Sequence, residues 1–258
     1  MKEKIQEIYN NNEYISHNPD LHSEDSEYKF SQFADMLGKL EIKNGRIKIL
    51  DVGGGAGILG KMVAVFFKEK GITVDFNTLD LSAEMLRIQK INHPEINESW
   101  NCTLEECPEN DFDLVLMIDV IEHIPDSESA ADALNNIGRY ILYNIPVQLN
   151  LFDGLRNMAN KFRYYAEQTR ILGHVHFFTV ASARRFLAKK HRIVTSAFRP
   201  YCFMLLNSTY PGYVEMRKSK TRLTEIKISC WIARNMKRLS GWMVQGSMFG
   251  LVKSTKNK

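Results

Sequence analysis

Residues 51–57 of the chain read DVGGGAG and separate two apolar segments. Residues 47–52 are typical of a short buried strand, and residues 58–70 are typical of a helix. Glycine lets the backbone turn sharply and lets a ligand lie against the main chain. Because doubly wound sheets bind nucleotides at such a turn after the first parallel strand, this stretch predicts a nucleotide-type cofactor site.

Apolar runs and helical patterns alternate along the chain beyond this turn. This alternation predicts a parallel sheet with right-handed crossovers. Residues 1–46 are polar and carry two helical patterns, around Ile5 and around Phe30, whereas residues 149–172 match neither period. Strands are predicted at 73–79, 112–119, 140–145, 191–201 and 248–253, and helices at 83–91, 127–137 and 182–190.

The glycine loop is compatible with two kinds of cofactor. Residues 55–60 also satisfy GxGxxG, and Asp80 lies 20 residues beyond Gly60, where a dinucleotide enzyme keeps its ribose-binding acid. The loop alone therefore favours nicotinamide dinucleotides and S-adenosylmethionine (SAM) equally. A purely structural glycine turn is the third interpretation.

Other segments distinguish between these cofactors. An acid two residues before the first glycine gives DxGxGxG, residues 79–82 read LDLS, and residues 111–124 read DFDLVLMIDVIEHI. With GHVHFFT at residues 173–179, these segments resemble the small-molecule branch of the class I SAM-dependent methyltransferases. Residues 18–29 also resemble the leader of a bacterial subgroup often associated with sugar and surface-glycan biosynthesis. The resemblance covers nearly the whole chain.

The resemblance implies an α/β fold with a doubly wound, Rossmann-like sheet. Its seven strands would have the order 3-2-1-4-5-7-6, with the last strand antiparallel. An N-terminal helical cap at residues 1–45 would cover the cofactor, and residues 46–258 would form the methyltransferase domain. Substrate-binding insertions are expected at about residues 146–180 and 205–245.

The resemblance also assigns cofactor contacts to individual positions. Asp80 would accept hydrogen bonds from both ribose hydroxyls, while an N-cap shared with Ser82 is its structural interpretation. Asn101 stands where the family often has an acid that contacts the adenine amine. The side-chain carbonyl of Asn101 can still accept a hydrogen bond from that amine, but the negative charge of the acid is lost. Asp119 would lie beside the methionine moiety, whose ammonium and sulfonium would partner the carboxylate. The implied cofactor-binding residues are Asp51, Gly53, Gly55, Gly57, Asp80, Leu81, Asn101, Cys102 and Asp119.

Methyl transfer is an in-line displacement, so alignment and desolvation can supply most of the catalysis. An oxygen or nitrogen nucleophile can still need a base, and imidazole titrates near neutral pH. His123 and His174 are the candidate catalytic residues, with His22 as the third, and loop positioning or packing is the structural interpretation of each. Tyr9 and Tyr14 would form a lid or pack against the core.

The net charge of +4 is unevenly distributed along the chain. Residues 1–183 contain 17 Lys/Arg and 28 Asp/Glu, whereas residues 184–258 contain 17 Lys/Arg and 2 Asp/Glu. Residues 217–242 predict a basic amphipathic helix with Trp231 and Trp242. This helix would dock on the acidic body with a solvated basic face, contact an anionic membrane or an acidic or lipid-linked substrate, or bind nucleic acid. Nucleic acid is the least favoured, because the segment shows no clear motif of aromatic residues interleaved with the charge, which RNA recognition would lead us to expect.

Composition excludes several classes of protein. With 44% hydrophobic and 25% charged residues, the chain is globular. No apolar run reaches the roughly 18 residues of a membrane-spanning helix, and residues 1–20 do not form a secretory signal. The four cysteines form no CxxC pair and no Cys/His cluster, so no metal site is expected. We expect a reduced, cytoplasmic chain, with peripheral membrane contact as an option.

These patterns together predict a SAM-dependent methyltransferase. The acceptor would be an oxygen or nitrogen atom of a small molecule, with a sugar or a lipid-linked glycan precursor as the expected class. A nicotinamide-dependent oxidoreductase on the same fold is one alternative, and a non-catalytic nucleotide-binding scaffold is the other. The sequence does not predict the oligomeric state.

Overall fold

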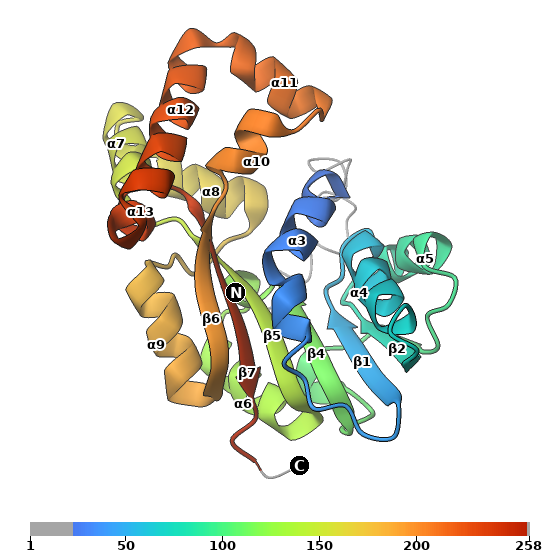
Figure 1. The fold of residues 1–258 in the computed structure, drawn as a ribbon. Helices are drawn as coiled ribbons and strands as arrows, with labels where there is room; N and C mark the ends of the chain where they lie inside the picture. Colours follow the sequence, from blue (N-terminus) through green and yellow to red (C-terminus); the bar gives the residue numbers. More distant parts are fainter. Residues whose placement is uncertain (1–22, 257–258) are drawn as a thin grey trace.

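The computed structural model describes residues 23–256. The predicted helix around Ile5 lies outside this range, as do His22, Tyr9 and Tyr14. Within it, the strands form one seven-stranded sheet in the order β3-β2-β1-β4-β5-β7-β6, as predicted (Figure 1). The strands are β1 Arg46–Val52, β2 Thr73–Leu79, β3 Ser99–Trp100, β4 Phe112–Ile118, β5 Gly138–Val147, β6 Arg192–Pro200 and β7 Gly246–Lys253.

The direction of the strands places several loops at one edge of the sheet. Strand β1 is parallel to β2 and to β4, and β4 is parallel to β5. Strand β7 runs antiparallel to both β5 and β6, which confirms the predicted last strand. The carboxyl ends of β1, β2 and β4 therefore meet, and the loops that follow them form the site described below.

Helices cover both faces of the sheet because the central strands are apolar on both sides. Phe33 of α3 and Phe67 of α4 are buried against Leu114 on one face, and Leu134 of α6 and Leu187 of α9 are buried on the other. Figure 1 shows α3 and α4 in front of the strands, with α5 beside α4. The bounds are α3 Ser26–Leu37, α4 Ile58–Lys68, α5 Ala83–Asn92, α6 Ser127–Ile137 and α9 Val180–Lys190.

A second group of helices lies beyond one end of the strands (Figure 1). Residues 149–172, which matched neither period, form α7 and α8. The helix predicted at 217–242 is wrong as a single element, because Met236 leaves helical geometry (φ −122°, ψ 47°) between α12 and α13. The break lets Gly241 pack on α9, where a Cβ would lie 2.5 Å from Val180. These helices are α7 Leu151–Ala159, α8 Tyr164–Leu172, α10 Cys202–Asn207, α11 Pro211–Lys218, α12 Lys220–Asn235 and α13 Lys237–Met243.

Strand β3 is a two-residue strand at the edge of the sheet. Strand β3 was not among the strand ranges predicted from apolar runs, because two edge residues carry no measurable periodicity. Among residues 23–256, no helix combines the length and the apolar character needed to cross a membrane.

Candidate functional site

The backbone conformation of the loop after β1 accounts for the spacing of its glycines. Gly53, Gly55 and Gly57, the three glycines of the DxGxGxG pattern, have φ values of 62°, 54° and 76°. These left-handed conformations are costly for residues with a Cβ. The Gly53 amide donates to the Leu79 carbonyl at 2.9 Å, which joins the loop to the end of β2. The alternating glycines therefore let the loop fold over the edge of the sheet.

Asp51 lies beneath this loop. A Cβ on Gly54 would come within 2.4 Å of Asp51 Oδ2, and a Cβ on Gly60 within 2.5 Å of the same atom. Sequence reasoning missed this role of Gly54 and Gly60, although both belong to the quoted glycine motifs. The Asp51 carboxyl thus supports the loop from inside and does not line the cavity.

The last glycine of the loop sets the contact between two helices. Gly57 is the N-cap of α4, and a Cβ there would lie 3.0 Å from Gln89 Cα of α5. Gln89 is buried and donates from Nε2 to Asp80 Oδ2 at 3.2 Å. The close approach of α4 and α5 therefore places the side-chain amide of Gln89 in hydrogen-bond contact with Asp80, the acid that follows β2.

Asp80 follows β2 and serves two purposes. Its Oδ1 accepts a hydrogen bond from the Ser82 amide at 2.9 Å, while the Ser82 side chain caps α5 through the Met85 amide. Each carboxylate oxygen accepts more than one hydrogen bond, so capacity for a ligand remains. Asp80 lines the cavity, and the structural and binding interpretations are therefore compatible.

Burial changes the proton affinity of both acids. Burial, reinforced by the negative charge of Asp80, raises the pKa of Asp51 to about 7. Burial also raises the pKa of Asp80 to about 6, against the lowering effect of the Ser82 and Gln89 hydrogen bonds. A bound cation or a set of hydroxyl donors would favour the charged form of either group.

A cavity of about 200 Å³ opens at the carboxyl ends of β1, β2 and β4. Seven of the predicted site residues line it: Gly53, Gly55, Asp80, Leu81, Cys102, Asp119 and His123. Four others, Asp51, Gly57, Asn101 and His174, are not part of its lining. Sequence reasoning missed Val52, Leu79, Met85, Thr103, Leu104, Glu105, Val120, Ile124 and Pro125, which are mostly apolar and directly adjoin the recognised motifs.

Asn101 has a structural task next to this cavity. Its Nδ2 donates to the backbone carbonyl of Asp80 at 3.0 Å. The amide therefore connects the end of β3 to the end of β2, and Cys102 and Thr103 form the wall at this point.

Asp119, at the end of β4, is held by three groups. Lys29 Nζ lies 2.6 Å from Asp119 Oδ2, and Asn144 Nδ2 donates to Asp119 Oδ1 at 2.8 Å. The Asp119 amide donates to the Asn144 carbonyl at 3.1 Å, and Asp119 has a left-handed φ of 55°. We expected the cofactor to supply the partner of this carboxylate, whereas the structure already supplies Lys29.

Lys29 reaches this position from α3. Its side chain is buried, and its Nζ also lies 2.7 Å from Asp25 Oδ2. Burial lowers the pKa of Lys29, but the charges of Asp119 and Asp25 outweigh burial and raise the pKa well above the ordinary value. The ammonium therefore stays charged and ties the N-terminal helix to the cavity.

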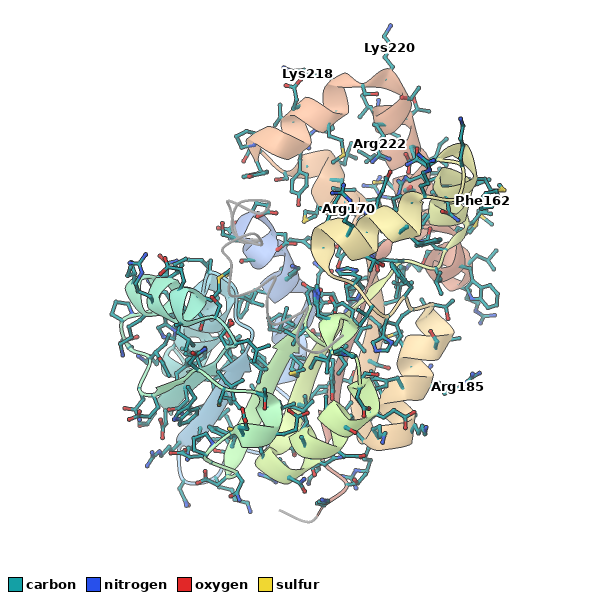
Figure 2. All side chains as sticks on the ribbon, turned by 180° about the vertical axis from the view of Figure 1, so that it is seen from behind. Phe162, Arg170, Arg185, Lys218, Lys220 and Arg222 are labelled. Carbon is teal, nitrogen blue, oxygen red and sulfur yellow. The ribbon has the colours of Figure 1, made fainter. Side chains whose placement is uncertain are left out.

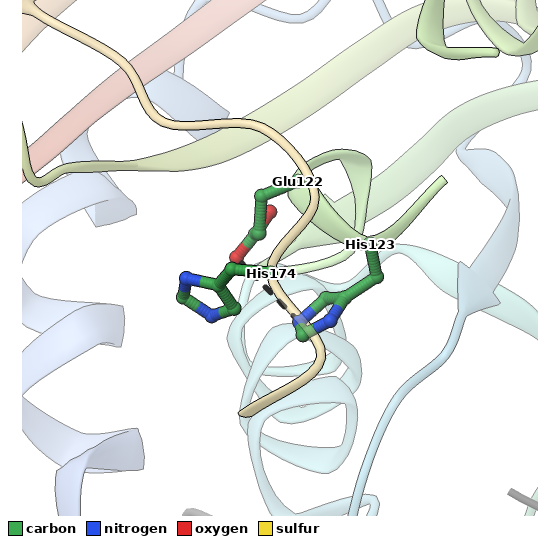
Figure 3. A group of neighbouring side chains, drawn as sticks. All are labelled: Glu122, His123 and His174. Atoms are coloured by element: carbon green, nitrogen blue, oxygen red, sulfur yellow. Dashed lines mark ion pairs between the residues drawn. The ribbon is translucent and has the colours of Figure 1, made fainter. Parts of the chain in front are cut away.

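Glu122, His123 and His174 come together in space (Figure 3). His123 Nε2 lies 3.9 Å from Glu122 Oε1, and the rings of His123 and His174 meet edge to face at 4.8 Å. His174 Nδ1 lies 2.9 Å from Gln148 Oε1, so one ring nitrogen is already engaged. His123 therefore faces the cavity, and His174 supports it from behind.

Two motifs that are distant in sequence form this cluster. The amides of Val175 and His176 both donate to the Glu122 carbonyl, at 2.9 and 3.1 Å. His176 Nε2 lies 3.0 Å from the Ile124 carbonyl. The segment GHVHFFT is thus joined to the segment after β4.

Glu122 is completely buried, and its two carboxyl oxygens have no hydrogen-bond partner among residues 23–256. Burial, together with the charge of Asp119, raises the pKa of Glu122 well above its ordinary value. One ligand atom from each of Glu122, His123 and His174 lies within 4.8 Å of the others, so the trio is a group that could hold a metal ion. The sequence predicted no such grouping, since His174 is distant along the chain.

The charge of the cavity distinguishes between the candidate cofactors. Its lining includes the carboxylates of Asp80, Asp119 and Glu105 and, among the described residues, no lysine or arginine. Most of the remaining wall is apolar. Such a cavity suits a ligand with an apolar ring system, hydroxyl donors and positive charge.

The comparison with protein families matches a methyltransferase domain over residues 23–190. The chain belongs to the methyltransferase-domain family. The matched range contains every residue of the cavity, and the sheet is that of the class I SAM-dependent methyltransferases. A search of curated protein sequences found no match.

Solved structures share this methyltransferase fold at low sequence identity. Phosphoethanolamine N-methyltransferase 2 of Haemonchus contortus, in complex with SAM, has a TM-score of 0.56 and 14% identity, over 88% of this chain and 53% of that one. The YcgJ protein of Bacillus subtilis has a TM-score of 0.51 and 14% identity, over 88% and 99%. The [4+2]-cyclase SpnF has a TM-score of 0.54 and 11% identity, over 88% and 81%. Because SpnF is a cyclase, the reaction must be argued from the site.

Proposed function

We propose that this methyltransferase domain transfers the methyl group of SAM to an oxygen or nitrogen atom of a small-molecule acceptor. The proposal rests on the charge of the cavity. Lys29 pairs with Asp119, but the carboxylates of Asp80 and Glu105 have no lysine or arginine beside them in the lining, and they would disfavour the pyrophosphate of a nicotinamide dinucleotide. The same carboxylates favour a ligand with a sulfonium and an ammonium.

The residues of the cavity suggest how SAM would lie. Asp80 would accept from the ribose hydroxyls, and Leu81, Met85 and Leu104 would enclose the adenine ring. Gly53 and Gly55 would let the methionine moiety lie against the main chain, with Asp119 at its reactive end. Asp51 and Gly57 would act indirectly by shaping the loop.

Bound SAM would supply a methyl group on a positively charged sulfur. The lone pair of the acceptor would form a bond to the methyl carbon while the bond from that carbon to sulfur breaks, and S-adenosylhomocysteine would leave. His123 would take the proton that an attacking hydroxyl gives up, or the proton that an ammonium must lose before its nitrogen can attack, because His123 lines the cavity. His174 positions His123 through the edge-to-face contact of their rings.

The chemical class of the methyl acceptor is argued from a solved structure and from a sequence motif. Phosphoethanolamine N-methyltransferase 2 acts on the nitrogen of a small molecule, which supports an acceptor of that size. A sugar or lipid-linked glycan precursor, expected from residues 18–29, stays a prediction.

Calorimetric titration with SAM, S-adenosylhomocysteine and NAD tests the cofactor. We expect saturable binding of the first two and none of NAD, and binding of NAD without SAM would refute the proposal. Transfer of radiolabelled methyl groups to a small-molecule extract then tests the reaction. If cofactor binds and no acceptor is labelled under any condition, a non-catalytic scaffold is the better interpretation.

A further inference from the structure

Helix α7 directs its apolar side chains outward. Leu151, Leu155 and Met158 follow one another at helical spacing and are 48%, 47% and 55% exposed. Its ionic residues lie on the opposite side: Asp153 is buried and pairs with Arg156, which also pairs with Glu225 of α12. A surface helix normally has the reverse arrangement. The stripe of α7 is therefore suited to contact with an apolar phase.

The chain places an aromatic ring at the end of this stripe. Phe162 follows α7 and is 72% exposed (Figure 2). Lys161 and Phe162 both have left-handed φ values, 51° and 62°, where glycine is the usual residue. A phenylalanine between Lys161 and Arg163 in this conformation presents a ring with positive charge on both sides.

The stripe continues onto α13, and the neighbouring helix α12 adds a further exposed tryptophan. A cavity of about 540 Å³ is lined by Leu151 of α7 together with Trp242 of α13, so the two helices share one apolar surface. Trp242 is 72% exposed and Leu239, also on α13, is 48% exposed. Trp231 of α12 is 58% exposed. We call the exposed side chains of α7, α12, α13 and Phe162 the apolar face.

Positive charge predominates around the apolar face, although Glu167 of α8 accepts a hydrogen bond from Asn160 at the end of α7. Both acidic residues of 184–258 are paired, Glu215 with Lys218 and Glu225 with Arg156 and Arg222. Lys237 and Arg238 are exposed beside Leu239. Lys220 projects from the tip of α12, and Figure 2 shows it with Lys218 at the outer end of this helical group.

We propose that the apolar face docks on the surface of an anionic phospholipid bilayer. Exposed tryptophan, phenylalanine and leucine with lysine and arginine beside them are typical of segments that lie in the membrane interface. The charge complements acidic headgroups, and each lysine or arginine near such a surface strengthens binding. Nucleic acid would use the charge but not the aliphatic stripe. This proposal is independent of the chemistry at the cavity.

Co-sedimentation of the full chain with vesicles tests the proposal. We expect binding to equimolar phosphatidylglycerol–phosphatidylcholine vesicles and little binding to phosphatidylcholine alone. Phe162→Ser combined with Trp242→Ser should abolish binding, and Lys237→Glu with Arg238→Glu should weaken it by at least about tenfold. Ile91→Ser, which removes an apolar side chain that is 61% exposed on α5, and Lys39→Glu are the matched controls.

Failure of the wild-type chain to bind anionic vesicles overturns the proposal, as does equal loss of binding in the control variants. Analytical ultracentrifugation of the same variants distinguishes a second copy of the chain as occupant. A dimer that Trp242→Ser dissociates, without vesicle binding, would assign the face to self-association. Equal unfolding midpoints for all variants show that the substitutions act at the surface.

Discussion

The Lys29 ammonium lies 2.6 Å from the Asp119 carboxylate and joins α3 to the part of the cavity that adjoins the end of β4. Lys29 also contacts Asp25, so one buried cation balances two acids. Helix α3, which precedes the first strand, therefore supplies the cation that pairs with an acid of the cavity lining. Any ligand that brings positive charge to Asp119 must share this carboxylate with Lys29.

Removal of the Lys29 charge should strongly destabilise the fold. Lys29→Met would leave the partly buried carboxylates of Asp25 and Asp119 without their cation, and the cost of about 3–5 kcal/mol for breaking a fully buried pair is the upper bound of the expected loss. Urea unfolding measures the loss, and Lys39→Met, at an exposed position just after α3, should be nearly neutral. Addition of Asp119→Asn should recover part of the loss, and strictly additive effects would argue against the pair.

Two glycines within helices should respond to alanine in opposite directions. In Gly60→Ala the new Cβ would lie 2.5 Å from Asp51 Oδ2 and 2.7 Å from the Phe76 ring, so we expect a loss of about 1–3 kcal/mol. In Gly154→Ala nothing lies within 4 Å, and the helix should gain about 0.5–1 kcal/mol. Thermal and urea unfolding check both values, and a stabilised Gly60→Ala protein would contradict the packing described for Asp51.

Replacement of Asp80 should weaken cofactor binding and change its pH dependence. Asp80→Ala should weaken SAM binding at least about tenfold, or 1.4 kcal/mol, because it removes the acceptor for the ribose hydroxyls. Since the pKa of Asp80 is raised by burial to about 6, SAM affinity of the unaltered protein should fall as the pH decreases below that value.

Titration calorimetry of wild type and Asp80→Asn across this pH range measures both effects. Ser82→Ala is the control, because it removes the cap of α5 and leaves the carboxylate. Unchanged affinity in Asp80→Ala would show that Asp80 only caps the helix.

Asp51 should make the ligand-free protein less stable as the pH rises. Burial raises its pKa to about 7 in the folded state, so the folded chain holds this proton more tightly than the unfolded chain. The resulting stabilisation is complete below the unfolded pKa near 4 and is lost as the pH increases to about 7, by about 3–4 kcal/mol.

Urea unfolding at several pH values measures this slope. Asp51→Asn should reduce it, leaving the contributions of Asp80 and Glu122, whose pKa values burial also raises, whereas Asp35→Asn at an exposed position on α3 should not change it. An identical slope in Asp51→Asn would mean that Asp51 is ionised in the folded protein.

Much of the fold was predictable because its elements have strong local signals. Strand β4 is a continuous apolar run, and its predicted range differs from the observed one by one residue. The predicted strand at 73–79 and the helix at 127–137 coincide with β2 and α6. The break at Met236 was not predictable, because the apolar periodicity continues across it.

The sequence by itself determined the glycine loop and the acid after β2, since these depend on local backbone chemistry and on motif spacing, whereas the order of the strands was implied by the family resemblance of the motifs. Only the tertiary structure decided the partners of the charged groups. Lys29 and Asp119, or His123 and His174, are far apart along the chain, and pattern carries no information about such contacts. The outward stripe of α7 was also decided there, because whether an apolar side chain is buried depends on what the rest of the fold places against it.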